Sequence, residues 1–286
     1  MPFLPPELLL EVIDHISGPA LSFPTVASVQ SLLALCLTSR SIYPHASQAL
    51  YSAISVSSPS ILLQLSESGV PEGRTVRALF LSRARLSAEQ LPAAERLLSS
   101  LAPFLERVIF DRRTESSAQL DAHLSLMPHL HEVAFTRQVT ELWGLEAVFL
   151  DSCPGVRRLA LHDYWTEEYH TARICRLFPG IRELVLACDV GVALVNDVLD
   201  TCPELKKVTL IKPRPRAGED WHAPVRTAGE DIDAEGKRTL ALPSRERELH
   251  MLEIPAPEED LGDLPSWAAD CIRDGECWIL NGVERP

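Results

Sequence analysis

One pattern of apolar and polar positions recurs five times along the middle of this chain. Each copy opens with a proline and continues with the core L-x-x-L-x-L, whose last four residues alternate as in a short strand with one buried face. The copies are PFLERVIF from Pro103, PHLHEVAF from Pro128, PGVRRLAL from Pro154, PGIRELVL from Pro179 and PELKKVTL from Pro203. The prolines are separated by 25, 26, 25 and 24 residues, and such even spacing indicates structural repeats that each contribute one strand.

The segments before the first of these copies and between the later ones carry apolar residues at helical spacing. They include Leu91, Ala94, Leu97, Leu98 and Leu101, and further on Ala193, Leu194, Val198 and Leu199. We expect these segments to form helices. The segment from Val76 to Leu81 fits the same strand core without a proline. We interpret it as a first, degenerate copy, because terminal repeats are usually atypical.

A repeat of this length with an L-x-x-L-x-L core resembles the leucine-rich repeat. The resemblance implies an α/β fold: a right-handed solenoid with a curved parallel sheet of about six strands inside and helices outside. In such a sheet the apolar positions of each core point inward, whereas the third and fifth residues face the open concave side. Two rows of side chains are therefore predicted on the concave side.

The third-position row is mainly charged. It consists of Ala78, Arg107, Glu132, Arg158, Glu183 and Lys207. Its charges alternate in sign over the last five strands, and neighbouring strands lie about 4.8 Å apart, so each charge would have an opposite neighbour. Two interpretations follow: the row stabilises the sheet as a series of ion pairs, or it contacts a target protein.

The fifth-position row is mainly apolar. It consists of Phe80, Ile109, Ala134, Ala160, Val185 and Thr209. An apolar strip of this length seldom stays bare, so either another protein or the chain's own tail covers it. Beyond the third proline-led strand, Tyr164 and Trp165 are candidate anchors for a partner, although such side chains also close the edges of cores. The candidate target-binding residues are Phe80, Arg107, Ile109, Glu132, Arg158, Glu183, Val185, Lys207, Tyr164 and Trp165.

The first fifty residues have a different pattern, which predicts three helices. Apolar side chains of the first helix form one stripe, with further leucines on its other faces; the stripe is Leu9, Val12, Ile13 and Ile16. A second helix is expected over residues 31–38, and a third, capped by Ser39 or Ser41, continues through Tyr51. The surplus leucines of the first helix fit either the centre of a small bundle or a position between its own domain and a partner.

These segments resemble the F-box motif. LPPELLLEVIDHI, LLALCLTSR and IYPHASQALY cover about residues 3–52, and they are similar to the F-box-like units of many fungal proteins with degenerate leucine-rich repeats. In that family the unit binds the Skp adaptor of cullin-based ubiquitin ligases, and the repeats hold the protein to be ubiquitinated. The resemblance implies adaptor contacts through Leu4, Pro5, Leu8, Leu9, Leu33, Ser39 and Ile42.

The C-terminal quarter breaks the repeat pattern. Proline, glycine and charged residues dominate residues 212–248, which predicts a loop or linker. Residues 249–254 then have the pattern of one more strand, and residues 265–272 and 278–280 offer apolar side chains for a closing cap. The expected organisation is a helical unit at 1–55, a repeat region at 56–211, a loop at 212–248 and a cap at 249–286.

The charge of the chain indicates which class of partner it binds. The chain has 27 basic and 40 acidic side chains and no basic block, which argues against nucleic acid or an anionic membrane and favours protein partners.

Seven cysteines without a C-x-x-C pair suggest neither a zinc motif nor a disulfide framework. We therefore expect reduced, buried thiols, with Cys153 and Cys202 as packing residues. No apolar run is long enough to span a membrane, so a soluble cytoplasmic or nuclear protein is expected.

Catalytic motifs are incomplete in this sequence. His131 and Glu132 begin an H-E-x-x-H pattern, but its last position is Phe135. A run from Asp231 resembles a calcium loop, but Leu242 occupies the twelfth position, where a glutamate is needed. We therefore expect no enzymatic activity and no cofactor. Two functions stay open: a substrate-recognition adaptor of a ubiquitin ligase, or an interaction scaffold whose F-box-like unit is a vestige that only caps the repeats.

Overall fold

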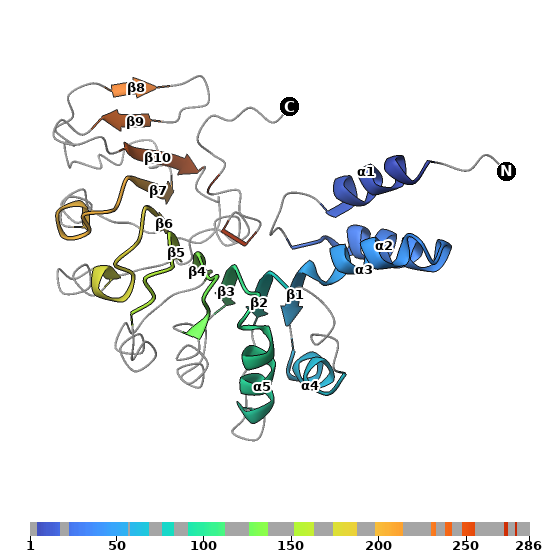
Figure 1. Ribbon diagram of the computed structural model, residues 1–286. Helices are drawn as coiled ribbons and strands as arrows, with labels where there is room; N and C mark the ends of the chain where they lie inside the picture. The colour runs from blue at the N-terminus through green and yellow to red at the C-terminus, as the bar shows by residue number, and fades with distance from the viewer. Residues whose placement is uncertain are drawn as a thin grey trace.

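The fold of this chain is built around one large sheet (Figure 1). The computed structural model describes residues 5–17, 23–56, 58–68, 76–82, 91–111, 126–136, 152–162, 174–187, 198–213, 230–232, 238–241, 248–254, 272–273 and 278. Within these residues ten strands lie in the order β1-β2-β3-β4-β5-β6-β7-β10-β9-β8, with helices beside them. The described part of the chain therefore belongs to the α/β class.

Most neighbouring strands of the sheet run parallel. From β1 to β7, and from β7 to β10, each pair of neighbours is parallel, whereas β9 is antiparallel to β10 and β8 is antiparallel to β9. The strands are β1 (Ala53–Val56), β2 (Ala78–Ser82), β3 (Arg107–Asp111), β4 (Glu132–Phe135), β5 (Arg158–His162), β6 (Glu183–Ala187), β7 (Lys207–Pro213), β8 (Glu230–Ile232), β9 (Arg238–Ala241) and β10 (Glu248–Ile254). The predicted parallel sheet is confirmed, because the proline-led copies stack side by side in chain order.

The repeated proline fixes the position at which each strand begins. The amide of Val156 donates to the carbonyl of Cys153 at 3.2 Å, so Pro154 occupies the second position of a four-residue turn, where proline is favoured. The same bond closes the turns that contain Pro128, Pro179 and Pro203. Each of the strands β3 to β7 begins four residues after its proline. The same turn thus precedes the strand in the four copies that begin at Pro128, Pro154, Pro179 and Pro203.

The main core lies between the sheet and the helices on its outer side. Each central strand contributes a buried side chain to it, namely Leu79, Val108, Val133, Leu159, Leu184 and Val208. Helix α5 (Leu91–Leu101), which was expected from its apolar spacing, buries Leu97, Leu98 and Leu101 in the same cluster. Helix α4 (Pro59–Glu67) lies on the same side of the sheet (Figure 1). Val198 and Leu199 are helical and buried, whereas Ala193 and Leu194 lie outside the described residues.

Three helices precede the sheet, as the sequence predicts. They are α1 (Pro6–Ser17), α2 (Val26–Thr38) and α3 (Tyr43–Ser52). Helix α2 begins earlier than expected because Thr25 caps it: the Thr25 hydroxyl accepts a hydrogen bond from the Ser28 amide at 3.1 Å. The predicted caps of α3 are wrong, since Ile42 is its N-cap residue and Ser39 ends α2. Pro44 lies in the first turn of α3, as expected.

Two predictions about the limits of the sheet need correction, namely a domain boundary at residue 55 and a loop at residues 212–248. Strand β1 follows α3 directly and pairs with β2, so the expected domain boundary at residue 55 falls inside a strand. Residues 212–248 were expected to form a loop, but they include β8 and β9, which extend the sheet beyond β10. Strand β10 matches the predicted strand at residues 249–254, and it is parallel to β7.

The cysteine prediction also needs correction. Cys175 and Cys202 form a disulfide, with their Cα atoms 5.3 Å apart, so these thiols are not reduced in the structure. They come close because each lies in the helical segment or turn before the proline of adjacent copies. Cys153, which was expected to be a packing residue, is buried in the main core.

None of the helices among the described residues has the length and apolar character that crossing a membrane requires.

Candidate functional site

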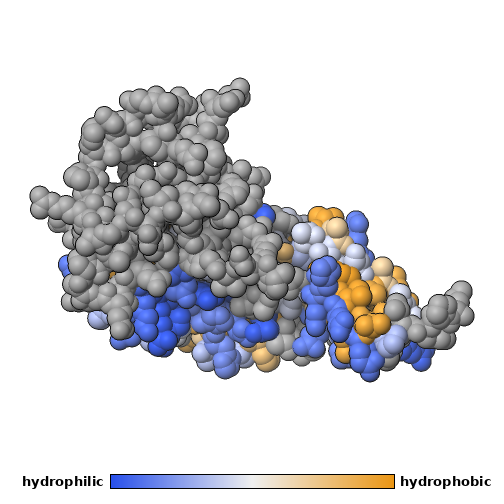
Figure 2. Space-filling model, turned by 90° about the horizontal axis from the view of Figure 1, so that it is seen from above, coloured by the Kyte–Doolittle hydropathy of each residue, from blue (hydrophilic) through white to orange (hydrophobic). Residues whose placement is uncertain are grey.

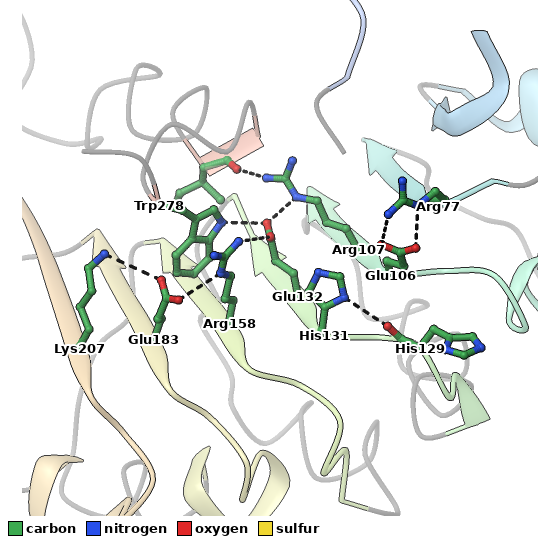
Figure 3. A network of polar contacts seen from close by, with 11 residues as sticks. Arg77, Glu106, Arg107, His129, His131, Glu132, Arg158, Glu183, Lys207 and Trp278 are labelled. Atoms are coloured by element: carbon green, nitrogen blue, oxygen red, sulfur yellow. Dashed lines mark hydrogen bonds and ion pairs between the residues drawn. The ribbon is translucent and has the colours of Figure 1, made fainter. Parts of the chain in front are cut away.

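The concave face of the sheet carries the predicted row of charges. Strand register places Arg107, Glu132, Arg158, Glu183 and Lys207 side by side in this order. Their side chains form a chain of ion pairs (Figure 3): the pairs are Arg107–Glu132 at 2.5 Å, Arg158–Glu132 at 3.9 Å, Arg158–Glu183 at 3.3 Å and Lys207–Glu183 at 3.9 Å. We call these five residues the charge row. The predicted alternation of paired charges along the sheet is confirmed.

The two ends of the charge row differ in burial. The side chains of Arg107 and Glu132 are only 2% and 3% exposed, whereas that of Arg158 is 40% exposed. Glu183 and Lys207 are also partly exposed. A buried pair loses hydration on both ions and needs further hydrogen bonds as compensation, whereas an exposed pair contributes little to stability. Additional partners are therefore needed at the β3–β4 end.

The C-terminal part of the chain supplies those partners. The guanidinium of Arg107 donates a hydrogen bond through Nη2 to the carbonyl of Ile272 at 2.7 Å. The indole Nε1 of Trp278 donates to Glu132 Oε1 at 2.8 Å, and the guanidinium of Arg158 lies 5.6 Å from the centre of the Trp278 ring (Figure 3). Residues more than 140 positions apart in sequence thus complete the hydrogen bonding of one buried ion pair.

The apolar row of the concave face is covered by the same segment. Its buried residues form a second cluster with side chains from neighbouring positions and from the C-terminal segment: Ile109, Ala134, Ala160, Val185, Ala187, Ile211 and Ile272. Phe23, Phe80 and Trp278 pack against this cluster. The rings of Phe23 and Phe80 lie 5.7 Å apart, and the guanidinium of Arg107 lies 5.8 Å from the Phe23 ring centre. Of the two covers considered from sequence, the structure shows the chain's own segments.

Several predicted target contacts are therefore not available on the surface. Arg107, Ile109, Glu132 and Val185, which were predicted to bind a target, are buried under the chain's own residues in this structure. The partly exposed members of the predicted set are Phe80, Arg158, Glu183 and Lys207. Tyr164 and Trp165 lie outside the described residues. Trp278 was expected only as an anchor of a cap, and nothing in the sequence pattern indicated Phe23.

A second ion pair lies beside the charge row, just before strands β2 and β3. Arg77 donates through Nε and Nη2 to the two carboxylate oxygens of Glu106, at 2.6 and 2.7 Å (Figure 3). These hydrogen bonds, together with the positive charge of Arg77, lower the pKa of Glu106 below its usual value. They also raise the pKa of Arg77. The pair ties two adjacent repeats together through a surface that is partly exposed.

The three N-terminal helices expose a second candidate surface. Large apolar side chains are exposed there, namely Leu8, Val12, Val26, Leu33, Leu37 and Tyr43. Figure 2 shows apolar surface over this end of the molecule. Leu37 is the most exposed of them, at 89%. We call these six residues the N-terminal apolar surface. Exposed large apolar side chains that gather in one region mark interaction sites.

The predicted adaptor-binding residues are distributed unevenly over this unit. Leu8, Leu33, Pro5 and Ser39 are exposed, and Leu9 is partly buried. Ile42 is a correction: only 3% of it is exposed, because it packs with Ile13, Leu32 and Ala46 in the core of the helical unit. Leu4 lies outside the described residues.

Four members of the N-terminal apolar surface were not predicted: Val12, Val26, Leu37 and Tyr43. Val12 was placed on the inner stripe of α1, but only Ile13 of that stripe is fully buried. The early start of α2 at Val26 could not be derived from apolar spacing.

No group of three or more His, Cys, Asp or Glu side chains that could hold a metal ion is present among the residues that the structure describes.

Comparison of the chain with known protein families and with curated proteins finds no match.

Proposed function

We propose that this chain is a non-enzymatic substrate-recognition adaptor of a cullin-based ubiquitin ligase. In this proposal the three N-terminal helices are an F-box-like unit that binds the Skp adaptor, and the leucine-rich-repeat-like sheet holds the protein to be ubiquitinated. Bringing the two together raises their effective concentration, and no chemistry by this chain is required. The proposal implies a cytoplasmic or nuclear location.

The observation that carries the proposal is the N-terminal apolar surface. Leu8 and Leu33, which the F-box resemblance assigns to the adaptor, have exposed side chains on helices whose own core is filled by other residues. Burying a large aliphatic side chain contributes about 1.5–3 kcal/mol. A protein partner that covers several of them would therefore gain substantial affinity, which supports an intermolecular role for this surface.

A specific contact favours a second candidate, an interaction scaffold whose helical unit only caps the sheet. The carbonyl of Ser52, the last residue of α3, accepts a hydrogen bond from the Arg77 amide at 2.8 Å, and β1 follows α3 without a linker. The helical unit is thus joined to the first edge of the sheet. A cap of this kind needs no adaptor.

Capture of the Skp adaptor by the purified chain distinguishes the two functions. We expect the wild type to retain the adaptor and the double variant Leu8→Asp, Leu33→Asp to lose at least nine-tenths of it, because two carboxylates would be buried without partners. Both positions are exposed, so the variant should keep the wild-type circular dichroism and melting temperature.

The matched control is Leu126→Asp, a substitution of an exposed leucine that precedes the Pro128 turn in the repeats. Unchanged capture by this variant is expected. A folded wild type that retains no adaptor would favour the scaffold instead.

A further inference from the structure

The two faces of the sheet are buried by different kinds of side chain. The outer face packs against helices through apolar residues. The concave face combines the apolar row with the charge row, whose Arg107 and Glu132 are almost completely buried. Paired charges regain hydration when they are exposed, so uncovering them costs less than uncovering an apolar core. On the concave face, hydration of the charged groups therefore offsets part of the cost of uncovering the side chains.

Side-chain contacts hold the segment that covers this face. They include the Arg107–Ile272 and Trp278–Glu132 hydrogen bonds, the position of the Trp278 ring beside Arg158, and the buried side chain of Ile272. Neither Ile272 nor Trp278 belongs to any strand of the described sheet. By contrast, β10 pairs with β7 over seven register positions. Contacts made outside a strand ladder open more readily than the ladder itself.

Each of these contacts recognises a group that another polypeptide could supply. Arg107 binds a main-chain carbonyl, and the small side chains Ala134 and Ala160 belong to the cluster that accommodates the Ile272 side chain. Glu132 accepts an indole N–H, and the Arg158 guanidinium lies close to the same ring. The combination fits a peptide with an aliphatic residue six positions before a tryptophan.

We propose that the C-terminal segment around Ile272 and Trp278 is an internal occupant of the concave face, and that this face binds a target polypeptide carrying an aliphatic residue and a tryptophan once the segment is displaced. This inference rests on the part of the proposed function that gives the concave face to a target, and it does not depend on adaptor binding. The segment limits target binding by competition within the chain.

Binding of a peptide in trans tests this inference. The probe is a fluorescein-labelled peptide of residues 269–282 with both cysteines replaced by serine, and the proteins are the full-length wild type and the double variant Ile272→Asp, Trp278→Ala. Fluorescence anisotropy should give at least tenfold tighter binding by the double variant, because its own segment no longer occupies the face. A peptide with alanine at the tryptophan position should lose at least tenfold in affinity. Equal affinity for wild type and variant, or no binding by either, would overturn the proposal.

The single variant Trp278→Phe isolates the hydrogen bond to Glu132. Phenylalanine keeps a ring beside Arg158 but has no N–H donor. The affinity of the Trp278→Phe variant for the peptide should therefore lie between those of the wild type and the double variant. An affinity equal to that of the wild type would show that the indole–Glu132 hydrogen bond does not contribute to recognition.

Two measurements keep the test valid if the double variant is damaged. Hydrogen–deuterium exchange of the wild type should be faster for amides at residues 272–278 than for those of β3 and β4, and equal protection would contradict displacement. Loss of cooperative thermal unfolding in the double variant would show that the segment is a permanent part of the core, which also overturns the proposal. Adaptor capture by the double variant is measured separately: capture without peptide binding contradicts only this inference, and peptide binding without capture contradicts only the ligase role.

Discussion

At the scale of single residues, two ion pairs of this protein differ in burial and therefore in how strongly the stability of the fold depends on each partner. Arg77 and Glu106 form a bidentate pair at a partly exposed position, whereas Arg107 and Glu132 form a buried pair. Removing one partner of a buried pair costs about 3–5 kcal/mol, because the other charge stays desolvated. An exposed pair contributes about 0–1 kcal/mol. The Ile272 carbonyl and the Trp278 indole complete the hydrogen bonds of the buried pair.

Substitution of Glu106 tests the exposed pair through its pH dependence. The folded-state pKa of Glu106 is lowered, so the pair stabilises the fold above the unfolded-state pKa, and this contribution is lost as the pH falls through the folded-state pKa. We expect Glu106→Gln to reduce the free energy of unfolding at neutral pH by about 0.2–1 kcal/mol. Urea denaturation at decreasing pH should show the variant and wild type converging in acid. A constant difference at every pH would contradict the assignment.

Gly180 permits a close approach of backbone between neighbouring repeats. A Cβ atom at this position would lie 2.5 Å from the carbonyl oxygen of Pro154, which is part of the preceding turn and cannot move aside easily. Gly180→Ala should therefore lower the free energy of unfolding by about 1–3 kcal/mol. Glu204 occupies the equivalent position of the next turn, and Glu204→Ala should change stability by less than about 0.5 kcal/mol. Equal effects of the two substitutions in chemical denaturation would refute this explanation.

At the scale of elements, each proline-led copy forms a turn followed by a strand. The residue at which each strand begins was predictable from sequence, because the proline lies in a turn and strands β3 to β7 each start four residues after it. The elements that were missed have no such local signal. Strand β1 is four residues long and follows a helix directly, and β8 and β9 depend on partners supplied by the rest of the sheet.

The disulfide between Cys175 and Cys202 connects the segments that precede two adjacent strands. Closing a loop of this length in the unfolded chain is expected to stabilise the fold by about 3–4 kcal/mol. Cys175→Ser should therefore lower the urea midpoint strongly without reductant and only slightly when both proteins are reduced. Cys36→Ser, which alters a cysteine of α2 outside this disulfide, is the control and should show no dependence on reductant. An equal loss with and without reductant would indicate that the thiols are not bonded.

At the scale of the whole molecule, a helical unit with an apolar surface precedes a sheet with two different faces (Figure 1). The alternation of the charge row and the alignment of the apolar row followed from strand register, which repeats along the chain. The cover over the concave face could not be derived, because the contacts of Arg107 and Glu132 with Ile272 and Trp278 join distant parts of the sequence. For the same reason the buried state of Ile42 was missed, since its environment is built from three helices.

The proposed function also belongs to this scale, because it requires one surface for the ligase and another for a target. Isothermal titration calorimetry of the purified wild type with the purified Skp adaptor tests it most directly. We predict saturable binding of one adaptor per chain, absent in the Leu8→Asp, Leu33→Asp variant and retained in Leu126→Asp. A folded wild type that gives no saturable binding, or a double variant that binds with unchanged affinity, would contradict the account.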